Sequence, residues 1–394
     1  MNTKLAVMTG SDLRSYGGGE KDIIAWTNLI ACDYITIFSL EDSSNVRLSY
    51  DQIHSMISER ITIVYYDAIK IHSISDLIPS SLVSLRKILS CRNYDVIYSS
   101  NSGVFFNFLL TLLCRISGVK MILGIHLMNF FNEKTKDRGF KKRFLMSIFI
   151  SFRKLVVRCQ KNIRIQNRSD FNSLNKLGFK GNIFNIPPLV KSYGSPGSSA
   201  KTTNEFVCLF VARLSVWHKG IDLLAEVVGK VLSKNHNVKF HIIGSGENGE
   251  GIVDNMCSTY PENVVWKGFL SDTDLGHEYE RASLFLQTSR GENFGISLAE
   301  AQMRGLPAVA FRTMGAEDII LESYQGTLIE AFDTDSFADA ILNYYIFWDS
   351  NSASFEENKM KISSAARTRY DSTVIISEMQ KMLGCNNRRF EDGI

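Results

Sequence analysis

The sequence contains no long apolar run and no cysteine pair at the spacing of a metal site. Its longest apolar runs, "GVFFNFLLTLLC" and "FLMSIFISF", are much shorter than the roughly 20 residues that a membrane-spanning helix needs. The apolar run near the start has only five residues, "LAVMT", too few for the core of a signal peptide. The seven cysteines are scattered without a C-x-x-C pair, which argues against a zinc module. These absences favour a cytoplasmic protein with reduced thiols.

Charge is distributed unevenly between the two halves of the chain. Residues 1–190 contain 25 Lys and Arg against 14 Asp and Glu, whereas residues 191–394 contain 19 against 27. The net charge of +3 conceals this difference. Such asymmetry suggests that the first half meets something anionic. The length of 394 residues and a hydrophobic content of 45% allow two domains with substantial cores.

Runs of β-branched residues alternate with helical patterns along most of the sequence. The runs are "LAVMT", "YITIFSL", "RITIVYY", "DVIYSS", "KMILGIH", "IRIQN" and "IFNIP" in the first half, then "FVCLFVA", "VKFHIIG", "NVVWKG", "LFLQTS" and "PAVAF". This alternation is typical of βαβ units on a parallel sheet. We therefore expect an α/β fold of two doubly wound domains facing each other across a cleft. The expected parts are a first domain at 1–190, a Pro-, Gly- and Ser-rich linker at 191–204, a second domain at 205–365, and C-terminal helices at 366–394 that can cross back to the first domain.

Ligands of open α/β sheets bind beyond the carboxyl ends of the strands, where turns lead into helix N-termini. In "GGGEKDII", Gly17, Gly18 and Gly19 allow the backbone to approach a ligand closely. In "RLSVWHKGIDLL", Arg213 and Lys219 place two cations after a strand, which suits a diphosphate. A flexible turn and ordinary surface cations are the plain alternatives.

A third turn, "GSGENG", contains Gly244, Gly246 and Gly249 in a literal G-x-G-x-x-G. The dinucleotide fingerprint belongs to a first βαβ unit, whereas this turn follows the second strand after the expected linker. We therefore favour a turn that packs against one phosphate or ribose over an NAD site.

Two carboxylates stand eight positions apart in "SRGENFGISLAEAQMRGLP". Glu292 falls on the turn before Gly295, and Glu300 falls inside the following helix, so both can face one crevice. Glu300 is surrounded by mostly apolar residues, where a carboxylate needs a partner; a solvated helix residue is the alternative. His126 ends the strand "KMILGIH", a position where a structural role is the more common one.

Taken together, several motifs resemble glycosyltransferase family 4, of the GT-B fold. They are "GGGE", His126, "ARLSVWHKGIDLL", "IIGSGE", "VVWKGFLSD" and "SRGENFGISLAEAQMRGLPAVAF", in this order. The most specific part is the E-x7-E element from Glu292 to Glu300. The resemblance extends from about Leu5 to the C-terminal helices.

The resemblance implies a retaining, metal-independent transfer of a hexose-type sugar from a nucleotide diphosphate sugar, UDP- or GDP-linked, to a glycan or lipid-linked acceptor. It implies no cofactor and a role in cell-surface polysaccharide or glycolipid synthesis. The catalytic residues that it implies are His126, Glu292, Arg213 and Lys219. The donor-binding residues are Gly17, Gly18, Gly19, Arg213, Lys219, Gly244, Gly246, Glu292, Phe294, Gly295 and Glu300, with Glu300 on the ribose and Glu292 on the sugar hydroxyls.

The sequence departs from the family pattern at a few positions. "TMGAEDII" replaces the common G-G-x-x-E run, so that Met314 and Gly315 stand at the glycine positions and Asp318 at the acid. The stretch "DTD", Asp333 to Asp335, resembles the metal-binding motif of the other glycosyltransferase fold. We assign it to capping of the helix that follows, with Asp335 or Ser336 as the expected N-cap.

Two other functions compete with this interpretation. A retaining glycoside hydrolase also uses two carboxylates, but it leaves Arg213, Lys219 and the glycine turns unexplained. A polyanion-binding protein is suggested by the basic stretch 134–168, although the acidic second half would repel a nucleic acid. We prefer an anionic membrane surface on the inner face of the membrane as the partner of this stretch, with the acceptor on the same side. The residues concerned are Lys141, Lys142, Arg143, Arg153 and Lys154; a solvated helix face is the alternative, and the sequence leaves the oligomeric state open.

Overall fold

Two parallel β-sheets form the framework of the protein. The computed structural model describes residues 3–16, 18–42, 46–71, 76–79, 82–100, 103–125, 140–193, 205–246 and 248–385. Contacts divide the chain into unit 1, which comprises 1–189 and 375–394, and unit 2, which comprises 190–374. Among the described helices, none is long and apolar enough to cross a membrane.

Unit 1 is built on a seven-stranded sheet of order β3-β2-β1-β6-β7-β8-β9, in which every pair is parallel. A short antiparallel hairpin, β4-β5, stands apart from it. The elements of this part of the chain are β1 (Lys4–Met8), the 3-10 helix η1 (Leu13–Ser15), α1 (Gly18–Leu29), β2 (Tyr34–Leu40), α2 (Tyr50–Ser55), β3 (Ile61–Tyr66), β4 (Ala68–Ile71), β5 (Asp76–Pro79), α3 (Leu82–Leu89), the 3-10 helix η3 (Ser90–Asn93), β6 (Val96–Ser99), α4 (Val104–Ser117), β7 (Lys120–Gly124), α5 (Phe140–Arg158), β8 (Asn162–Ile165), α6 (Arg168–Lys176) and β9 (Asn182–Asn185).

Helices cover both faces of this sheet. On one face Trp26 of α1 and Ile53 of α2 pack with β-strand residues, and on the other face Phe106 and Leu110 of α4 do so. The strands read as near-continuous β-branched runs because both of their faces are buried.

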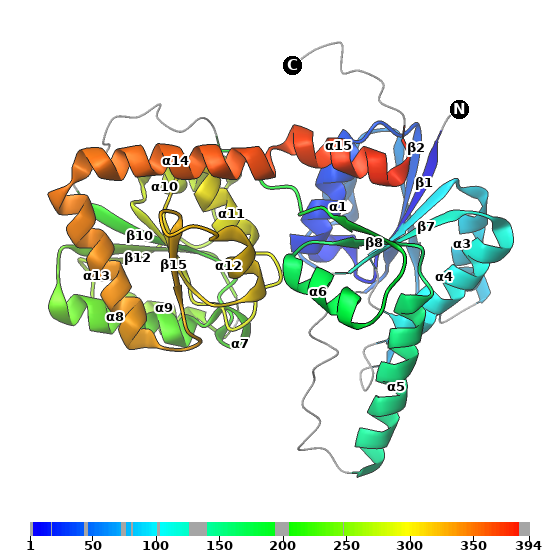
Figure 1. Ribbon diagram of the computed structural model, residues 1–394, viewed down its shortest axis with the longest axis horizontal. Helices are drawn as coiled ribbons and strands as arrows, with labels where there is room; N and C mark the ends of the chain where they lie inside the picture. The colour runs from blue at the N-terminus through cyan, green and yellow to red at the C-terminus, as the bar shows by residue number, and fades with distance from the viewer. Residues whose placement is uncertain are drawn as a thin grey trace. The chain divides into compact units, whose positions relative to one another are not determined.

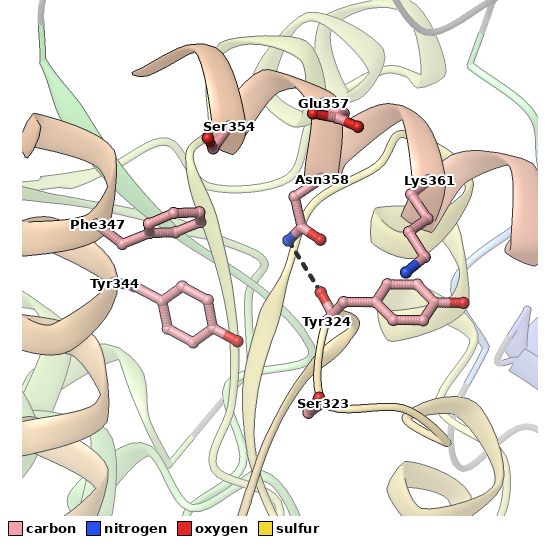
Figure 2. Close-up of a pocket in the computed structure, with 8 residues that line it drawn as sticks. All are labelled: Ser323, Tyr324, Tyr344, Phe347, Ser354, Glu357, Asn358 and Lys361. Carbon is pink, nitrogen blue, oxygen red and sulfur yellow. Dashed lines mark hydrogen bonds between the residues drawn. The ribbon is translucent and has the colours of Figure 1, made fainter. Parts of the chain in front are cut away.

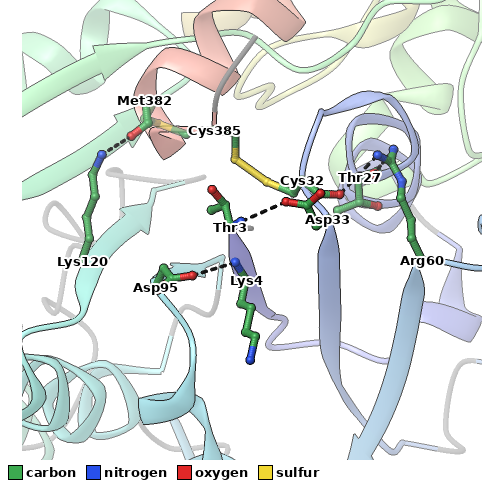
Figure 3. Close-up of a disulfide and its surroundings, with 10 residues drawn as sticks. All are labelled: Thr3, Lys4, Thr27, Cys32, Asp33, Arg60, Asp95, Lys120, Met382 and Cys385. Carbon is green, nitrogen blue, oxygen red and sulfur yellow. Dashed lines mark hydrogen bonds between the residues drawn. A yellow bond between two sulfur atoms is a disulfide. The ribbon is translucent and has the colours of Figure 1, made fainter. Parts of the chain in front are cut away.

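The last described helix, α15 (Ser372–Leu383), belongs to unit 1 from Ile375 onward, although it follows unit 2 in the chain. Its residues Ile375, Met379 and Leu383 join the core on the α1 side of the sheet. A disulfide connects Cys385, just after α15, to Cys32, and Nζ of Lys120 donates to the carbonyl of Met382 at 2.6 Å (Figure 3). The sequence analysis expected reduced thiols, whereas the structure pairs two of the seven cysteines across 353 residues.

Unit 2 is built on a six-stranded parallel sheet of order β12-β11-β10-β13-β14-β15. Its elements are β10 (Phe206–Val211), α7 (Val216–Lys219), α8 (Ile221–Lys234), β11 (Val238–Ile243), α9 (Glu250–Thr259), β12 (Val264–Trp266), α10 (Asp272–Arg281), β13 (Leu284–Gln287), α11 (Ile296–Met303), β14 (Ala308–Phe311), α12 (Met314–Ile319), β15 (Gly326–Ile329), α13 (Thr334–Ser350) and α14 (Ser352–Tyr370).

The sheet of unit 2 is also covered on both faces. Helices α8, α9 and α13 bury their apolar residues against one face. Helices α10, α11, α12 and the end of α14 cover the other, as the ribbon shows (Figure 1). Both sheets are thus doubly wound, which confirms the expected fold class.

Every run that the sequence analysis took for a strand lies on a strand. The β4-β5 hairpin and β15 were not predicted from the sequence; only two of the four residues of β15 are buried. The sequence analysis also chose the wrong N-cap for α13: Asp333 is the cap and accepts from the backbone N of Ser336 at 3.0 Å, while Asp335 pairs with Lys230 at 2.8 Å. The "DTD" stretch does cap the helix, through its first residue.

Candidate active site

Most of the predicted donor-binding residues lie where the strand order of unit 2 reverses. Strand β10 has β11 on one side and β13 on the other, so the loops after these strands diverge and leave room at the carboxyl edge of the sheet. Ligands of doubly wound sheets bind at such a switch point. Arg213 follows β10, and Glu292 follows β13.

The glycine turn after β11 packs against the turn after β10. A Cβ on Gly244 would lie 1.8 Å from the carbonyl oxygen of Ala212, and a Cβ on Gly249 would lie 2.6 Å from that of Leu214. Gly244 and Gly246 also have φ values of 132° and 159°. The backbone N of Leu214 donates to the carbonyl of Ser245 at 3.1 Å. These glycines therefore allow two turns to touch at the carboxyl edge of the sheet, where Arg213 follows β10.

The position of Lys219 is set by a tight turn between α7 and α8. Ser215 caps α7, and Gly220 ends it with a φ of 65°. A Cβ on Gly220 would lie only 2.1 Å from the carbonyl oxygen of Thr288. The hydroxyl of Thr288 donates to the carbonyls of Lys219 and Gly220 at 3.0 Å each. The turn that contains Lys219 is thus held by hydrogen bonds and close packing against Thr288, just after β13.

A second set of contacts that holds the same turn was not predicted from the sequence. Arg290 donates to both carboxylate oxygens of Asp222, at 2.7 and 2.6 Å, and to the carbonyl of Val216 at 2.6 Å. The hydrogen bonds from Arg290 hold the pKa of Asp222 below its usual value. The pair joins the loop after β13 to both α7 and α8. Its members are 68 residues apart, and no local motif connects them.

The structure brings Lys219 and Glu292 together as an ion pair, between Nζ and Oε2. Their side chains are 23% and 18% exposed, so the pair is partly screened from water. Among the described residues Arg213 has no ion-pair partner, and it is exposed. One cation of the site is therefore available to an anion directly, and the other is held by a carboxylate.

The loop after Glu292 is shaped by close contact with α12. The backbone N of Gly315 donates to the carbonyl of Glu292 at 3.0 Å, and a Cβ on Gly315 would lie 2.3 Å from the carbonyl oxygen of Phe294. Gly295 precedes α11 with a φ of 88°. Of the two positions where the family has glycines, Gly315 is thus the one that this contact requires, and Met314 is tolerated. The Phe294 side chain is buried against Tyr370, so only its backbone can reach a ligand.

Glu300 lies deeper, on α11, and is only 8% exposed. The hydroxyl of Tyr279 donates to its Oε2 at 2.9 Å. Tyr193 stacks on Tyr279 with ring centroids 5.4 Å apart, and burial together with the nearby Glu300 carboxylate raises the pKa of Tyr193. The buried carboxylate thus has the partner that the sequence analysis required of it. Neither tyrosine was singled out from the sequence.

The predicted residues of unit 1 are only partly described. Gly18 and Gly19 open α1 after β1 and are exposed, and a Cβ on Gly19 would have no atom within 4 Å. Gly17 and His126 lie outside the described residues, as do the side chains of Lys141, Lys142 and Arg143 on α5. Arg153 and Lys154 are half-buried on the same helix.

A separate pocket of about 440 Å³ opens at the amino end of β15 (Figure 2). Tyr344, Phe347, Glu357 and Lys361 line it from α13 and α14, together with Tyr324. Because the strands are parallel, this edge of the sheet is opposite to the edge that carries Lys219 and Glu292. The pocket is thus not part of the predicted site.

The chain is similar to known glycosyltransferases. Residues 195–360 match the family described as glycosyl transferases group 1. The poly(ribitol-phosphate) alpha-N-acetylglucosaminyltransferase of Staphylococcus aureus is 34% identical over 163 residues, 41% of this chain and 32% of that protein. The UDP-Gal:alpha-D-GlcNAc-diphosphoundecaprenol alpha-1,3-galactosyltransferase of Escherichia coli is 24% identical over 294 residues, 66% of this chain and 69% of that protein. The match with the first two curated relatives spans about a third of their length.

The fold has close counterparts among solved structures. HepE of Anabaena, solved in complex with UDP, superimposes with a TM-score of 0.73 at 16% identity and covers 97% of this chain and 100% of that chain. At this identity the likeness concerns the fold alone. Membership of the narrower family 4 stays a prediction. The chain therefore resembles the glycosyl transferases group 1 over residues 195–360, and its fold is GT-B.

Proposed function

We propose that the protein is a retaining, metal-independent glycosyltransferase. It moves a hexose-type sugar from a nucleotide diphosphate sugar to a glycan or lipid-linked acceptor, in the synthesis of a cell-surface polysaccharide or glycolipid. The observation that carries the proposal is the ion pair of Lys219 and Glu292 at the switch point of unit 2, with Arg213 on the loop between β10 and the helix that Lys219 ends. Two cations and one carboxylate match a ligand with a diphosphate at one end and hydroxyls at the other.

The proposed donor site divides the nucleotide sugar between these residues. Arg213 and Lys219 bind the diphosphate, beside the backbone of Gly244 and Gly246, and Glu292 accepts hydrogen bonds from the sugar hydroxyls. Glu300 binds the ribose. The unit 1 residues Gly17, Gly18, Gly19 and His126 keep the roles that the family resemblance implies, as predictions.

Two features support the metal-independent part of the proposal. When the bond between the sugar and the diphosphate breaks, negative charge grows on the departing diphosphate, and Arg213 and Lys219 supply positive charge at that point. The aspartates of the "DTD" stretch are engaged elsewhere, Asp333 as a helix cap and Asp335 with Lys230.

The names of the relatives support the choice of donor and acceptor. HepE was solved with UDP and with UDP-glucose, and the Escherichia coli relative is named for UDP-Gal, which favours a UDP-linked donor over a GDP-linked one. The same name includes a diphosphoundecaprenol acceptor, and the Staphylococcus aureus relative is named for poly(ribitol-phosphate). Several of the names specify alpha products, which supports retention if the donor is itself alpha-linked. A cytoplasmic location is part of the proposal.

A glycoside hydrolase fits the geometry less well. Such an enzyme needs two carboxyl groups that flank one bond. Glu292 is paired with Lys219 on a loop, whereas Glu300 is buried on a helix beside Tyr279. The two carboxylates therefore occupy different surroundings, and Arg213 and Lys219 would have no task.

The proposal is tested by thermal unfolding of the purified protein with UDP-, GDP- and ADP-sugars. A bound donor raises the melting temperature in a concentration-dependent way, and we expect the largest rise with a UDP-sugar. Arg213→Ala should weaken donor binding by roughly 1.5–3 kcal/mol, because it removes charge-assisted hydrogen bonds to the diphosphate. The matched control is Arg281→Ala, an exposed arginine of the same unit that pairs with Glu205 at 3.5 Å; it should leave binding unchanged.

Turnover is then measured with the best donor in the presence and absence of EDTA, and the anomeric configuration of the product is read by NMR. Lys219→Ala should lower turnover more than binding if this cation acts mainly on the departing diphosphate. Activity that is lost with EDTA and restored by manganese, or an inverted product, would contradict the corresponding part of the proposal. Unchanged donor affinity in Arg213→Ala would contradict the site itself.

A further inference from the structure

Helix α4 has apolar side chains on two opposite faces, and the described residues bury only one of them completely. Phe106, Leu110 and Cys114 are buried against the sheet of unit 1. Apolar side chains also occupy the opposite face, where five of them are 41% to 79% exposed: Phe105, Phe108, Leu109, Leu112 and Ile116. A helix of a globular protein normally has one apolar stripe, which faces the core, so a second apolar stripe on α4 needs another explanation.

The five exposed side chains form one continuous stripe. At about 100° per residue, their positions fall within an arc of about 100° around the helix axis. The spacing of i, i+3, i+4, i+7 and i+11 is that of one face of an amphipathic helix. Single exposed apolar residues are normal on a protein surface, whereas a contiguous group of this kind marks an interaction site.

Helix α5 extends this surface and adds positive charge to it. Phe152 of α5 lies 5.3 Å, centroid to centroid, from both Phe105 and Phe108, and Leu155 on the next turn is 53% exposed. Arg115, at the end of α4, donates to the carbonyl of Cys159 at 2.8 Å. The stripe and the end of α5 therefore form one surface.

Acidic residues are absent from both helices. The sequence contains no Asp or Glu from residue 96 to 132 or from 138 to 169, and α5 alone contains six Lys and Arg. Among the cations of α4, α5 and the residues just after α5, Arg115, Arg158 and Lys161 are exposed, and Arg153 and Lys154 are half-buried. A surface that is both apolar and uniformly cationic is complementary to one that is apolar beneath an anionic layer.

We propose that the exposed stripe of α4, with the cations of α5 beside it, docks unit 1 on an anionic lipid membrane. The helix lies in the plane of the interface and buries the stripe at the boundary between headgroups and acyl chains. At 14 residues it is about 21 Å long, too short to span a hydrocarbon core of roughly 30 Å. The lysines and arginines contact the anionic headgroups. The proposal does not depend on the glycosyl transfer proposed above.

The test is sedimentation of the whole protein with vesicles of phosphatidylglycerol and phosphatidylcholine. We expect binding that weakens from 10 mM to 150 mM salt, as the screening length falls from about 30 to 8 Å, and that is much weaker with phosphatidylcholine alone. The double variant Leu109→Ser, Leu112→Ser should bind about 30-fold more weakly, because each half-exposed leucine loses part of its transfer free energy.

A matched double variant separates this effect from a general loss of surface hydrophobicity. Ile346→Ser, Met360→Ser changes two apolar residues of unit 2 that are somewhat more exposed than the two leucines, and it should bind vesicles like the unchanged protein. Both double variants should keep the melting temperature, since the replaced side chains are exposed. As a readout of depth, a tryptophan introduced by L112W should gain fluorescence that brominated lipids quench.

Three outcomes would overturn the proposal. The first is absence of vesicle binding by the unchanged protein at 10 mM salt. The second is equal binding by the α4 variant and by its unit 2 control. The third is a change of oligomeric state in sedimentation velocity caused by the α4 variant without a change in vesicle binding, which would assign the stripe to a second copy of the chain.

Discussion

Replacing Glu292 with Gln should change the preference of the site between a nucleoside diphosphate and a nucleotide sugar. In the structure Glu292 holds Lys219 in an ion pair. If Lys219 binds the diphosphate, this carboxylate competes with the ligand for the same cation. If Glu292 also accepts hydrogen bonds from the sugar, the same substitution removes a contact that only the sugar makes. UDP and UDP-sugar should therefore respond in opposite directions.

The size of each effect follows from the kind of contact. Release of Lys219 from a partly buried pair should strengthen UDP binding by about 1 kcal/mol, or roughly fivefold. A hydrogen bond to a charged group contributes about 1 kcal/mol more than one to a neutral group. If two sugar hydroxyls donate to the carboxylate, the sugar loses about 2 kcal/mol. The UDP-sugar, which also gains from the release of Lys219, should then bind about 1 kcal/mol more weakly overall. The dissociation constant of UDP divided by that of the UDP-sugar should therefore fall by roughly 30-fold.

Isothermal titration with UDP and with the UDP-sugar measures this ratio directly. The control is Glu330→Gln, an exposed glutamate of unit 2 that pairs with Arg312 at 2.8 Å, which should leave both affinities unchanged. Equal weakening of UDP and UDP-sugar by Glu292→Gln would refute the reasoning, because it would mean that Glu292 acts on the site as a whole and does not distinguish the two ends of the ligand.

Two further predictions concern the scaffold around the site. A double-mutant cycle on Arg290 and Asp222, measured by urea unfolding, should give a coupling free energy of about 1 kcal/mol because the pair is bidentate. The same cycle on the exposed pair of Arg281 and Glu205 should give about 0.2 kcal/mol. Equal coupling free energies in the two cycles would contradict a special role of the Arg290–Asp222 pair. Burial raises the pKa of Glu278, but hydrogen bonds with His241 and Lys267 outweigh burial and lower this pKa to about 2. The ionised Glu278 therefore stabilises the folded state fully above the unfolded-state pKa of about 4.3, and this contribution is lost as the pH falls toward 2. Glu278→Gln should therefore cost about 2 kcal/mol at pH 7, after allowance for solvent screening, and clearly less at pH 3; a cost that is the same at both pH values would argue against an ionised Glu278.

The framework of the fold was predictable because buried parallel strands have a local signature. Twelve β-branched runs each correspond to a strand. The strand that was missed in unit 2, β15, is four residues long and lies at the sheet edge, so it lacks the continuous apolar run of an inner strand. The β4-β5 hairpin stands outside both main sheets, so it does not have the continuous apolar run of a buried parallel strand either.

The partners of the site residues were less predictable than the residues themselves. Arg213 and Glu292 lie on loops that follow strands, and Lys219 ends the short helix α7 just before α8; a local pattern can indicate such positions. The contacts that surround the site join side chains far apart in the sequence, such as Arg290 with Asp222 or Tyr279 with Glu300. The same holds for α4, whose sequence shows an apolar run but not which of its faces the sheet covers.

The glycines of the candidate site show why a literal motif can mislead about chemistry and still indicate the right place. "GSGENG" matches a dinucleotide fingerprint, yet Gly244 and Gly249 are needed because a Cβ would collide with the backbone of residues 212–214. Gly220 is needed in the same way against Thr288, and Gly315 against Phe294. In each case two turns at the carboxyl edge of the sheet touch through their backbones. The N–H groups of Leu214, Gly244 and Gly315 already donate to backbone carbonyls, so what these glycines provide is the close approach of the turns. A glycine motif at a switch point therefore indicates close packing of turns first, and the kind of phosphate ligand has to be inferred from the charged residues around it.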